Sequence, residues 1–436
     1  MRITWLLPLL GSFGLLAQDP PTKAAPASPP ATKKAAPRTF AAFPVADEAP
    51  LDLDVVTKEA VASLLALQEG EDREQWPYQG VYREDRSSPS PVGYRVGGTS
   101  IACLGLLAAP GYRTDRGRQE AVGRGLRFVL KTLDAPRMQG DFVGTYDVRG
   151  WGHIYGLLLL LALQEAKAVP ADLAEQVAAK ETWLVQTLCD SAIPQAGGWN
   201  YSRPRGYTSS GNTASPFMTA PALQALFLAK ARGHTVPDQV VTQALDALER
   251  ARAKPGGYAY GAPAKSQNEV DEAQLTMMDK TPSSAARAAA CEVTLLLAGR
   301  GDLGRLERAV DLFFAHWDDL AVRKSQTGTH IPPYGIAPYY FLYGHVYAAQ
   351  AIEFVSDPKK RDELRGKMRA MLAKSREADG SWNDRQFERS GGYGTAMALL
   401  AMHMPHLPKM PKWSPSGDAA AKGAPAADAP VKDAGK

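Results

Sequence analysis

The sequence predicts an all-α fold, an (α/α)6 toroid in which six outer helices alternate with six inner helices. Two observations predict it: apolar helical runs rich in Ala and Gly recur six times along the chain, and an amphipathic helix precedes each of them. The apolar runs recur at intervals of 50 to 69 residues, as expected for repeated helix pairs. An open array of such pairs would leave one apolar face exposed, so we expect the repeats to close into a ring.

The two ends of the chain are not expected to belong to this ring. Residues 1–17 carry one Arg and then a short apolar run that ends in a small residue, which is typical of a secretory signal peptide. Residues 18–48 form a Pro/Ala/Lys-rich linker and residues 414–436 a similar disordered tail, since neither contains enough large apolar side chains to order itself. The repeat domain then spans 49–413. We expect an exported protein, periplasmic or extracellular.

The charge balance argues against a nucleic-acid partner. The formal net charge is +4, but residues 1–38 account for it, because they hold five basic residues and one acidic residue. The repeat region is close to neutral, whereas a nucleic-acid-binding protein needs a basic face that displaces counterions. Contact with a membrane is possible but is not indicated by the composition.

The outer helices are predicted from amphipathic patterns with charged residues on the exposed face. One stripe of apolar side chains in residues 237–253 is typical, with Val240, Leu245 and Leu248 on the same side. Asp or Pro often stands at the start, as the chemistry of helix N-termini favours. The six predicted outer helices lie near 52–68, 116–133, 172–189, 237–253, 302–319 and 358–376.

The inner helices are predicted from runs that are apolar nearly all round, such as "GWGHIYGLLLLLAL" and "GYGTAMALLAM". A turn with Gly and an aromatic residue precedes most of them, for example "AGGWNY", "PGGYAYG" and "DGSW". We expect the turn residues Trp199, Tyr258 and Trp382 to brace the ring between neighbouring outer helices. The three cysteines stand in apolar helical contexts and read as buried thiols, with one disulfide or metal ligation as alternatives.

These turns carry a resemblance to a known superfamily. "KMRAMLAKSREADGSW" and "IPQAGGWNYSRP" resemble the turn motif of the prenyltransferase and squalene-cyclase repeat proteins, although Arg376 stands near the usual Gln. "YGHVYAAQA" and "YGTAMALLAM" are similar to segments of secreted repeat proteins of planctomycete-type bacteria. The resemblance covers about 50–410. It implies a terpenoid cyclase-like α/α toroid of bacterial origin.

The catalytic motifs of that superfamily are missing from this chain. Its class II cyclases use an Asp-x-Asp-Asp motif as the acid, but none occurs here, and "LDLD" at 51–54 lacks the final Asp. Its protein prenyltransferases bind zinc through Asp-x-Cys, but Ala289 stands two places before Cys291. We therefore expect no metal and no cofactor, and the resemblance leaves open whether the protein is an enzyme.

A candidate site is expected where the N-termini of the inner helices meet. His and Tyr gather in "YDVRGWGHIYG" and "THIPPYGIAPYYFLYGHVYAAQ", although each of them could also be a core residue with satisfied hydrogen bonds. The candidate catalytic residues are Asp147, His153, Tyr340 and His345, which we expect to line one cavity. The candidate ligand-binding residues are Arg149, Trp151, Tyr155, Asn212, Arg287, His330, Tyr334, Tyr339 and Tyr343.

Two classes of function fit these residues. The first is a binding module whose aromatic-lined central cavity takes an extended apolar, isoprenoid-like or amphiphilic small molecule. The second is an enzyme with His, Tyr and Asp as acid and base, either a polysaccharide lyase or hydrolase or a divergent terpenoid cyclase. A wall of aromatic and aliphatic residues favours the first, and an open cleft with Arg, Asn and paired acids favours the second. Fold alone does not decide between them.

Overall fold

The computed structural model describes residues 52–78, 90–144, 148–201, 205–207, 213–254, 256–263, 275–325, 330, 332–337, 339–384 and 389–416. The chain divides into two compact units, Met1–Pro44 and Val45–Lys436, and all described residues lie in the second. The predicted signal peptide at 1–17 and linker at 18–48 lie outside the described residues. No helix within the described ranges is long and apolar enough to cross a membrane.

The second unit is built from alternating outer and inner helices. The outer helices are α1 (Leu53–Ala66), α3 (Arg116–Thr132), α5 (Ala174–Ser191), α7 (Asp238–Arg250), α9 (Leu303–Ala315) with the short α10 (Trp317–Ala321), and α12 (Pro358–Ser375). The inner helices are α2 (Val92–Ala108), α4 (Arg149–Glu165), α6 (Pro216–Ala231), α8 (Thr281–Leu297), α11 (Tyr340–Ile352) and α13 (Ser390–His403). The described residues form no strand, only isolated bridges such as Glu69 with Gln75.

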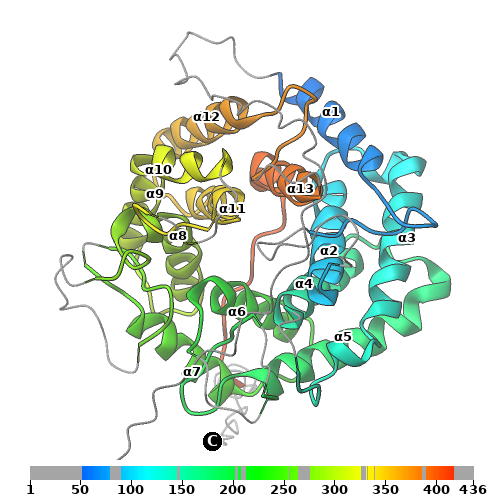
Figure 1. Ribbon diagram of the computed structural model, residues 1–436, viewed down its shortest axis with the longest axis horizontal. Helices are drawn as coiled ribbons and strands as arrows, with labels where there is room; N and C mark the ends of the chain where they lie inside the picture. The colour runs from blue at the N-terminus through cyan, green and yellow to red at the C-terminus, as the bar shows by residue number, and fades with distance from the viewer. Residues whose placement is uncertain are drawn as a thin grey trace, which may run out of the picture. The chain divides into compact units, whose positions relative to one another are not determined.

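The inner helices form a closed ring. Each packs against the next along the chain, and α13 packs against α2, which returns the ring to its start. Figure 1 shows this ring within a circle of outer helices. The predicted (α/α)6 toroid is therefore confirmed. Closure follows from the composition of the inner helices, since nearly every residue of α8 is buried, and a helix apolar on all sides needs neighbours on all sides.

Three turn tryptophans repeat one pair of hydrogen bonds. The indole N–H of Trp76, Trp199 and Trp382 donates to the carbonyl of Leu64, Leu188 and Leu372, respectively, in the last turn of the preceding outer helix. The backbone N–H of the same three residues donates to a hydroxyl oxygen on the next inner helix, that of Thr99, Thr219 and Thr395, respectively. The turn tryptophan thus joins an outer helix to the inner helix that follows it, whereas the sequence suggested a wedge between two outer helices.

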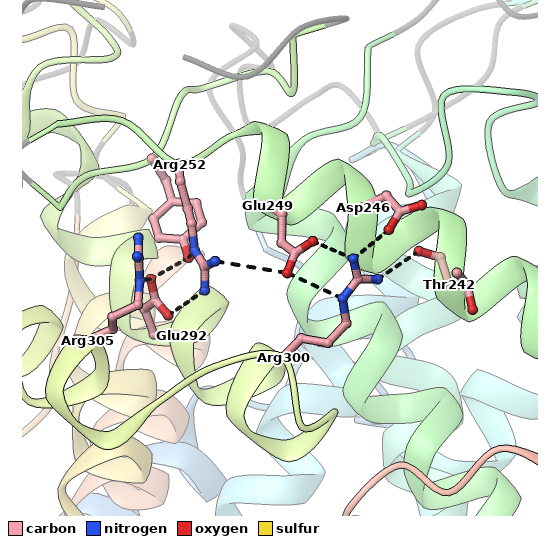
Figure 2. A network of polar contacts seen from close by, with 8 residues as sticks. Thr242, Asp246, Glu249, Arg252, Glu292, Arg300 and Arg305 are labelled. Atoms are coloured by element: carbon pink, nitrogen blue, oxygen red, sulfur yellow. Dashed lines mark hydrogen bonds and ion pairs between the residues drawn. The ribbon is translucent and has the colours of Figure 1, made fainter. Parts of the chain in front are cut away.

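Tyr258 takes the equivalent place before α8 but is held by charged groups. Its hydroxyl donates to Glu292 at 2.7 Å, and the carboxylate of Glu292 also pairs with Arg252 and Arg305. Figure 2 shows how this chain of charges continues from Arg252 through Glu249 to Arg300, so that α7, α8 and the start of α9 are tied together. Like the three turn tryptophans, Tyr258 has a buried aromatic ring.

The C-terminal segment after α13 crosses to the opposite side of the ring. The backbone N–H of Trp413 donates to the carbonyl of Leu297 at the end of α8, and its ring packs on Phe227 of α6 with a centroid separation of 5.4 Å. Ser416 donates its N–H to Asp238 at the start of α7. This segment therefore covers the end of the ring where the inner helices finish, and it leaves the N-terminal end as the place for a site.

Candidate functional site

An aromatic cluster occupies the ring at the N-terminal ends of the inner helices. We call it the aromatic mouth, and its seven residues surround one small cavity: Tyr78, Tyr94, Trp151, Tyr201, Phe217, Tyr339 and Tyr393. They come from the beginnings of α2, α4, α6 and α13 and from the turns that precede α2, α6 and α11. The cavity measures about 10 Å³, which is roughly the room that one water molecule needs.

The helix positions explain why these rings converge. Trp151 is the third residue of α4 and Tyr94 the third residue of α2, so both project from a first turn toward the same end of the ring. Gly97 on α2 makes room for the indole, because a Cβ there would stand 2.4 Å from an atom of the Trp151 ring. A glycine on one inner helix thus permits the large aromatic side chain on its neighbour.

The rings of the mouth pack edge-on or tilted against one another. Tyr94 meets Trp151 at 5.6 Å and 81°, and Tyr78 lies 4.8 Å from Tyr393 on the other side. Each such pair stabilises the fold by about 0.5–1.5 kcal/mol beyond its buried area. The aromatic lining that the sequence indicated is present, but the described aromatic side chains contact one another across the toroid. They leave far less room than the expected cavity for an extended ligand.

Tyr339, which precedes α11, and two tyrosines of α11 pack against Phe217 on the far side of the mouth. The hydroxyls of Tyr339 and Tyr201 lie 2.7 Å apart, and the hydroxyl of Tyr343 donates to the carbonyl of Phe217 on α6. Tyr340 packs edge-on against Phe217 and is 1% exposed. Burial raises the pKa of both Tyr340 and Tyr343 above the ordinary value, so these phenols stay protonated near neutral pH and are poor bases.

A buried carboxylate at the mouth was not among the residues that the sequence singled out. Asp384 is 0% exposed, and its Oδ2 accepts a hydrogen bond of 3.1 Å from the hydroxyl of Tyr78. The repeated turns contain a pattern that points to Asp384. The second residue after the turn aromatic is Tyr78 in "WPY", Tyr201 in "WNY" and Tyr260 in "YAY", but it is Asp384 in "WND". Aligning the turns would have marked this position as the one where an acid replaces a tyrosine.

His153 points away from the mouth. Its Nε2 lies 2.8 Å from the carbonyl oxygen of Met138 and donates to it, while Nδ1 lies 3.4 Å from the hydroxyl of Tyr207. Its ring packs edge-on against Trp183 of the outer helix α5. Burial lowers the pKa of His153 to about 4, and the charge of Arg149 adds to this. Both ring nitrogens are occupied by protein groups.

His345 is enclosed in the same way on the other side of the ring. Its Nδ1 donates to the carbonyl of Phe341 at 2.8 Å, and its Nε2 accepts from the indole N–H of Trp317 at 2.9 Å. Burial lowers its pKa to about 4. The expectation that His153 and His345 line one cavity is therefore wrong. Both imidazoles face outer helices, because an inner helix has a side toward the outer ring as well as a side toward the axis.

Arg149 and Arg287 hold the loops around the mouth. Arg149 donates to the carbonyls of Gln139 and Phe142, and its guanidinium stacks on the rings of Phe142 and Tyr207. Arg287 donates to the carbonyls of Tyr258, Met278 and Ser283. Both are 1% exposed. Their charges are engaged with backbone oxygens, so neither is placed to meet an anionic ligand as the sequence suggested.

The remaining candidates divide into three groups. Trp151 and Tyr155 pack edge against face at 5.3 Å on α4, at the mouth and just below it. His330 is exposed, with its Nδ1 2.7 Å from the carbonyl of Gly335, and Tyr334 is half-buried nearby. Asp147 and Asn212 lie outside the described residues. Within the described ranges, no group of three His, Cys, Asp or Glu side chains could hold a metal ion, and the three cysteines are free buried thiols.

Comparison with known proteins gives information about the fold of this chain but not about its chemistry. No family model matches the sequence, and no curated protein does. Among solved structures, a D-mannose isomerase aligns with 81% of this chain and 97% of its own at 11% identity and a TM-score of 0.52. A type II terpene cyclase from Scytonema aligns with 81% and 98% at 15% identity and a TM-score of 0.46. An α-1,6-mannanase from Salegentibacter aligns with 80% and 99% at 9% identity and a TM-score of 0.49.

At such low identity these alignments speak to architecture alone. The likeness to the isomerase extends over nearly the whole of that chain and over 81% of this one, so it concerns the overall arrangement of the helices. The chain is thus similar in fold to α/α-toroid proteins, and its chemistry has to be argued from its own residues.

Proposed function

We propose that the protein is an exported α/α-toroid binding module that takes an apolar or amphiphilic, isoprenoid-like ligand at the aromatic mouth. The observation that carries the proposal is the convergence of seven aromatic side chains from separate segments on one point at the N-terminal end of the ring. Concave aromatic sites with a few polar groups are the usual form of a small-molecule site. The hydroxyls of Tyr201 and Tyr339 supply such polar groups here.

The chemistry of the wall favours binding over acid–base catalysis by histidine. His153 and His345 have both nitrogens engaged and pKa values near 4, so neither meets a substrate as the acid or base that the alternative requires. Because the cavity has room for only about one water molecule, the ligand has to displace rings as it enters. We therefore expect slow association that speeds up on warming.

A second candidate function rests on Asp384. A fully buried carboxyl group against Tyr78 at an aromatic mouth is a suitable acid for protonating an alkene, and aromatic faces stabilise the cation that results. This would make the protein a divergent terpenoid cyclase whose acid stands at a position outside the usual motif. It shares the ligand class of the first proposal and differs only in whether the ligand is turned over.

One experiment tests both candidates with geranylgeraniol as the probe. The purified full chain is incubated with the alcohol, freed of excess by gel filtration and extracted for mass spectrometry. We expect the wild type to retain the probe and Trp151→Leu to bind it at least about tenfold more weakly, as for loss of a central aromatic anchor. Trp183→Leu on the outer helix α5 is the matched control and should retain the probe.

The outcomes separate the proposals. Failure of the wild type to retain the probe, or equal retention by Trp151→Leu, would overturn the binding site. An isomer of the probe that appears with the wild type and disappears with Asp384→Asn would favour the cyclase, because the amide keeps the shape but is no acid. Unchanged probe in every sample favours the binding module.

Export is the remaining part of the proposal. It rests on residues 1–17, whose single Arg and short apolar run are typical of a signal peptide. Expression with a C-terminal tag in a Gram-negative host, followed by osmotic shock and N-terminal sequencing, tests it. We expect a periplasmic product that begins after residue 17, and a full-length product in the cytosol would contradict export.

A further inference from the structure

A second and larger cavity lies away from the aromatic mouth. It is a groove of about 400 Å³ between the short helix η1 (Tyr112–Thr114), the middle of α3, and residues 166–170, which follow α4. Its size falls within the range of about 300–1,000 Å³ that is usual for small-molecule sites. It is some forty times larger than the cavity in the mouth, and the two cavities share no lining residue.

The floor of the groove is apolar and its rim is positive. Tyr112, Val122 and Leu126 are buried beneath it. Burial raises the pKa of Tyr112 to about 12, so its phenol stays neutral and adds no negative charge. Arg113 and Lys167 stand exposed at the rim. None of the residues that line the groove is acidic, and neither cation has a carboxylate partner within the described part of the chain.

The cations are held in position over the groove. The guanidinium of Arg113 donates to the carbonyl of Ala166 at 3.2 Å, which bridges the two sides. The last carbonyls of α4 accept hydrogen bonds from the backbone N–H groups of Ala166, Lys167 and Ala168. Three carbonyls at the negative end of α4 are therefore paired with protein donors, and the charged side chains that line the groove are the cations Arg113 and Lys167.

We propose that this groove is a binding site for a small organic carboxylate with a flat or branched apolar body. The apolar part would lie on Tyr112, Val169 and Pro170, which line the groove above the buried Val122 and Leu126, and the carboxylate would meet Arg113 and Lys167. Arg suits this role because its fork of N–H groups can hold a carboxylate while one arm stays on the backbone. The site is separate from the aromatic mouth and needs no contribution from it.

Gly123 gives a precise way to close the groove. It lies on α3 at the lining, and a Cβ there would meet no atom within 4 Å, so the wall is open at this point. Gly123→Trp places an indole in the groove without a backbone clash. Gly123→Ala is the matched control, since it adds one methyl group and improves helix propensity while leaving the groove nearly empty.

Isothermal titration calorimetry with 2-naphthoate tests the proposal, with 2-naphthylmethylammonium as a probe of the same shape and opposite charge. We expect the wild type and Gly123→Ala to bind the carboxylate and Gly123→Trp to lose it at an unchanged melting temperature. The double variant Arg113→Gln, Lys167→Gln should bind at least about tenfold more weakly, as for loss of charge-assisted hydrogen bonds. Added salt should weaken binding to the wild type.

Three results would overturn the site: no heat of binding with the wild type, equal affinity for the two probes, or unchanged affinity in Gly123→Trp. Trp151→Leu reports on the other cavity. This variant should bind 2-naphthoate as the wild type does. If Trp151→Leu lost naphthoate binding and Gly123→Trp kept it, the probe would bind at the aromatic mouth, and the groove would be refuted. Retention of geranylgeraniol by Gly123→Trp keeps the two sites distinct.

Discussion

The indole N–H of Trp382 donates to the carbonyl oxygen of Leu372 over 2.8 Å, which satisfies a carbonyl that α12 leaves free in its last turn. The side chain is 0% exposed, and its backbone N–H donates to Thr395 on α13. One residue therefore ends an outer helix and fixes the start of the next inner one. The same geometry recurs at Trp76 and Trp199, so three of the turns that lead into inner helices are joined in this way.

Trp382→Ala is expected to destabilise the fold without touching the ligand site. Truncating a buried Trp costs about 3–5 kcal/mol, because packing is lost and a cavity remains. Trp413→Ala is the control, since that indole is only partly buried near the C-terminus. Chemical denaturation should show a much larger loss for Trp382→Ala. A loss no greater than that of the control would contradict the bracing role.

Two glycine substitutions should act in opposite directions. A Cβ on Gly394 of α13 would stand 2.3 Å from the carbonyl oxygen of Trp382, whereas a Cβ on Gly366 of α12 would meet nothing within 4 Å. Gly394→Ala should therefore push α13 off its turn and lower the melting temperature. Gly366→Ala should raise the free energy of unfolding by about 0.5–1 kcal/mol through helix propensity. If both variants were stabilised, the close approach at Gly394 would be refuted.

Sequence reasoning predicted the fold well because periodicity and burial act over whole helices. The outer helix expected near 358–376 is Pro358–Ser375, and the one expected near 116–133 is Arg116–Thr132. The site was harder, because the side of an inner helix that a residue takes depends on the neighbours it packs against. His153 and Trp151 are two residues apart, yet one faces α5 and the other the mouth. Asp384 was missed because it lies in a turn outside the apolar runs.

Glu292 is expected to be a main electrostatic support of the ring. Its carboxylate is 4% exposed and accepts from Arg252, Arg305 and Tyr258. Glu292→Gln removes the charge while two guanidinium groups remain beside it, and breaking a buried pair in this way costs about 3–5 kcal/mol. Glu120→Gln is the control, because Glu120 is 56% exposed in its pair with Arg116.

Urea titrations of these two variants should therefore differ sharply. The midpoint should fall strongly for Glu292→Gln and stay nearly unchanged for Glu120→Gln. A similar small shift for both would mean that the network in Figure 2 contributes little beyond packing. In that case the hydrophobic contacts of α8 alone would hold α7 and α9 in place.

Three buried histidines predict how stability depends on pH. Burial lowers the pKa of His153, His345 and His403 to about 4 from an ordinary value of 6.5. Between these values the unfolded chain binds protons that the folded chain rejects, so the free energy of unfolding falls as the pH drops from about 6.5 toward 4. Integrating over that interval gives about 2 kcal/mol lost per histidine between pH 7 and pH 5. Above pH 7 both states are neutral and this contribution vanishes.

Denaturation at pH 7 and pH 5 measures this loss, and His345→Gln isolates one histidine. The variant should be less stable at pH 7, because Gln does not reproduce the contacts of the imidazole with Phe341 and Trp317. Its further loss between pH 7 and pH 5 should be smaller than that of the wild type by about 2 kcal/mol, since one titrating group is gone. His316→Gln is the control, because His316 is partly exposed and paired with Asp319. An equal pH dependence in the wild type and His345→Gln would show that the imidazole of His345 reaches solvent and is free to take up a proton in the folded ring.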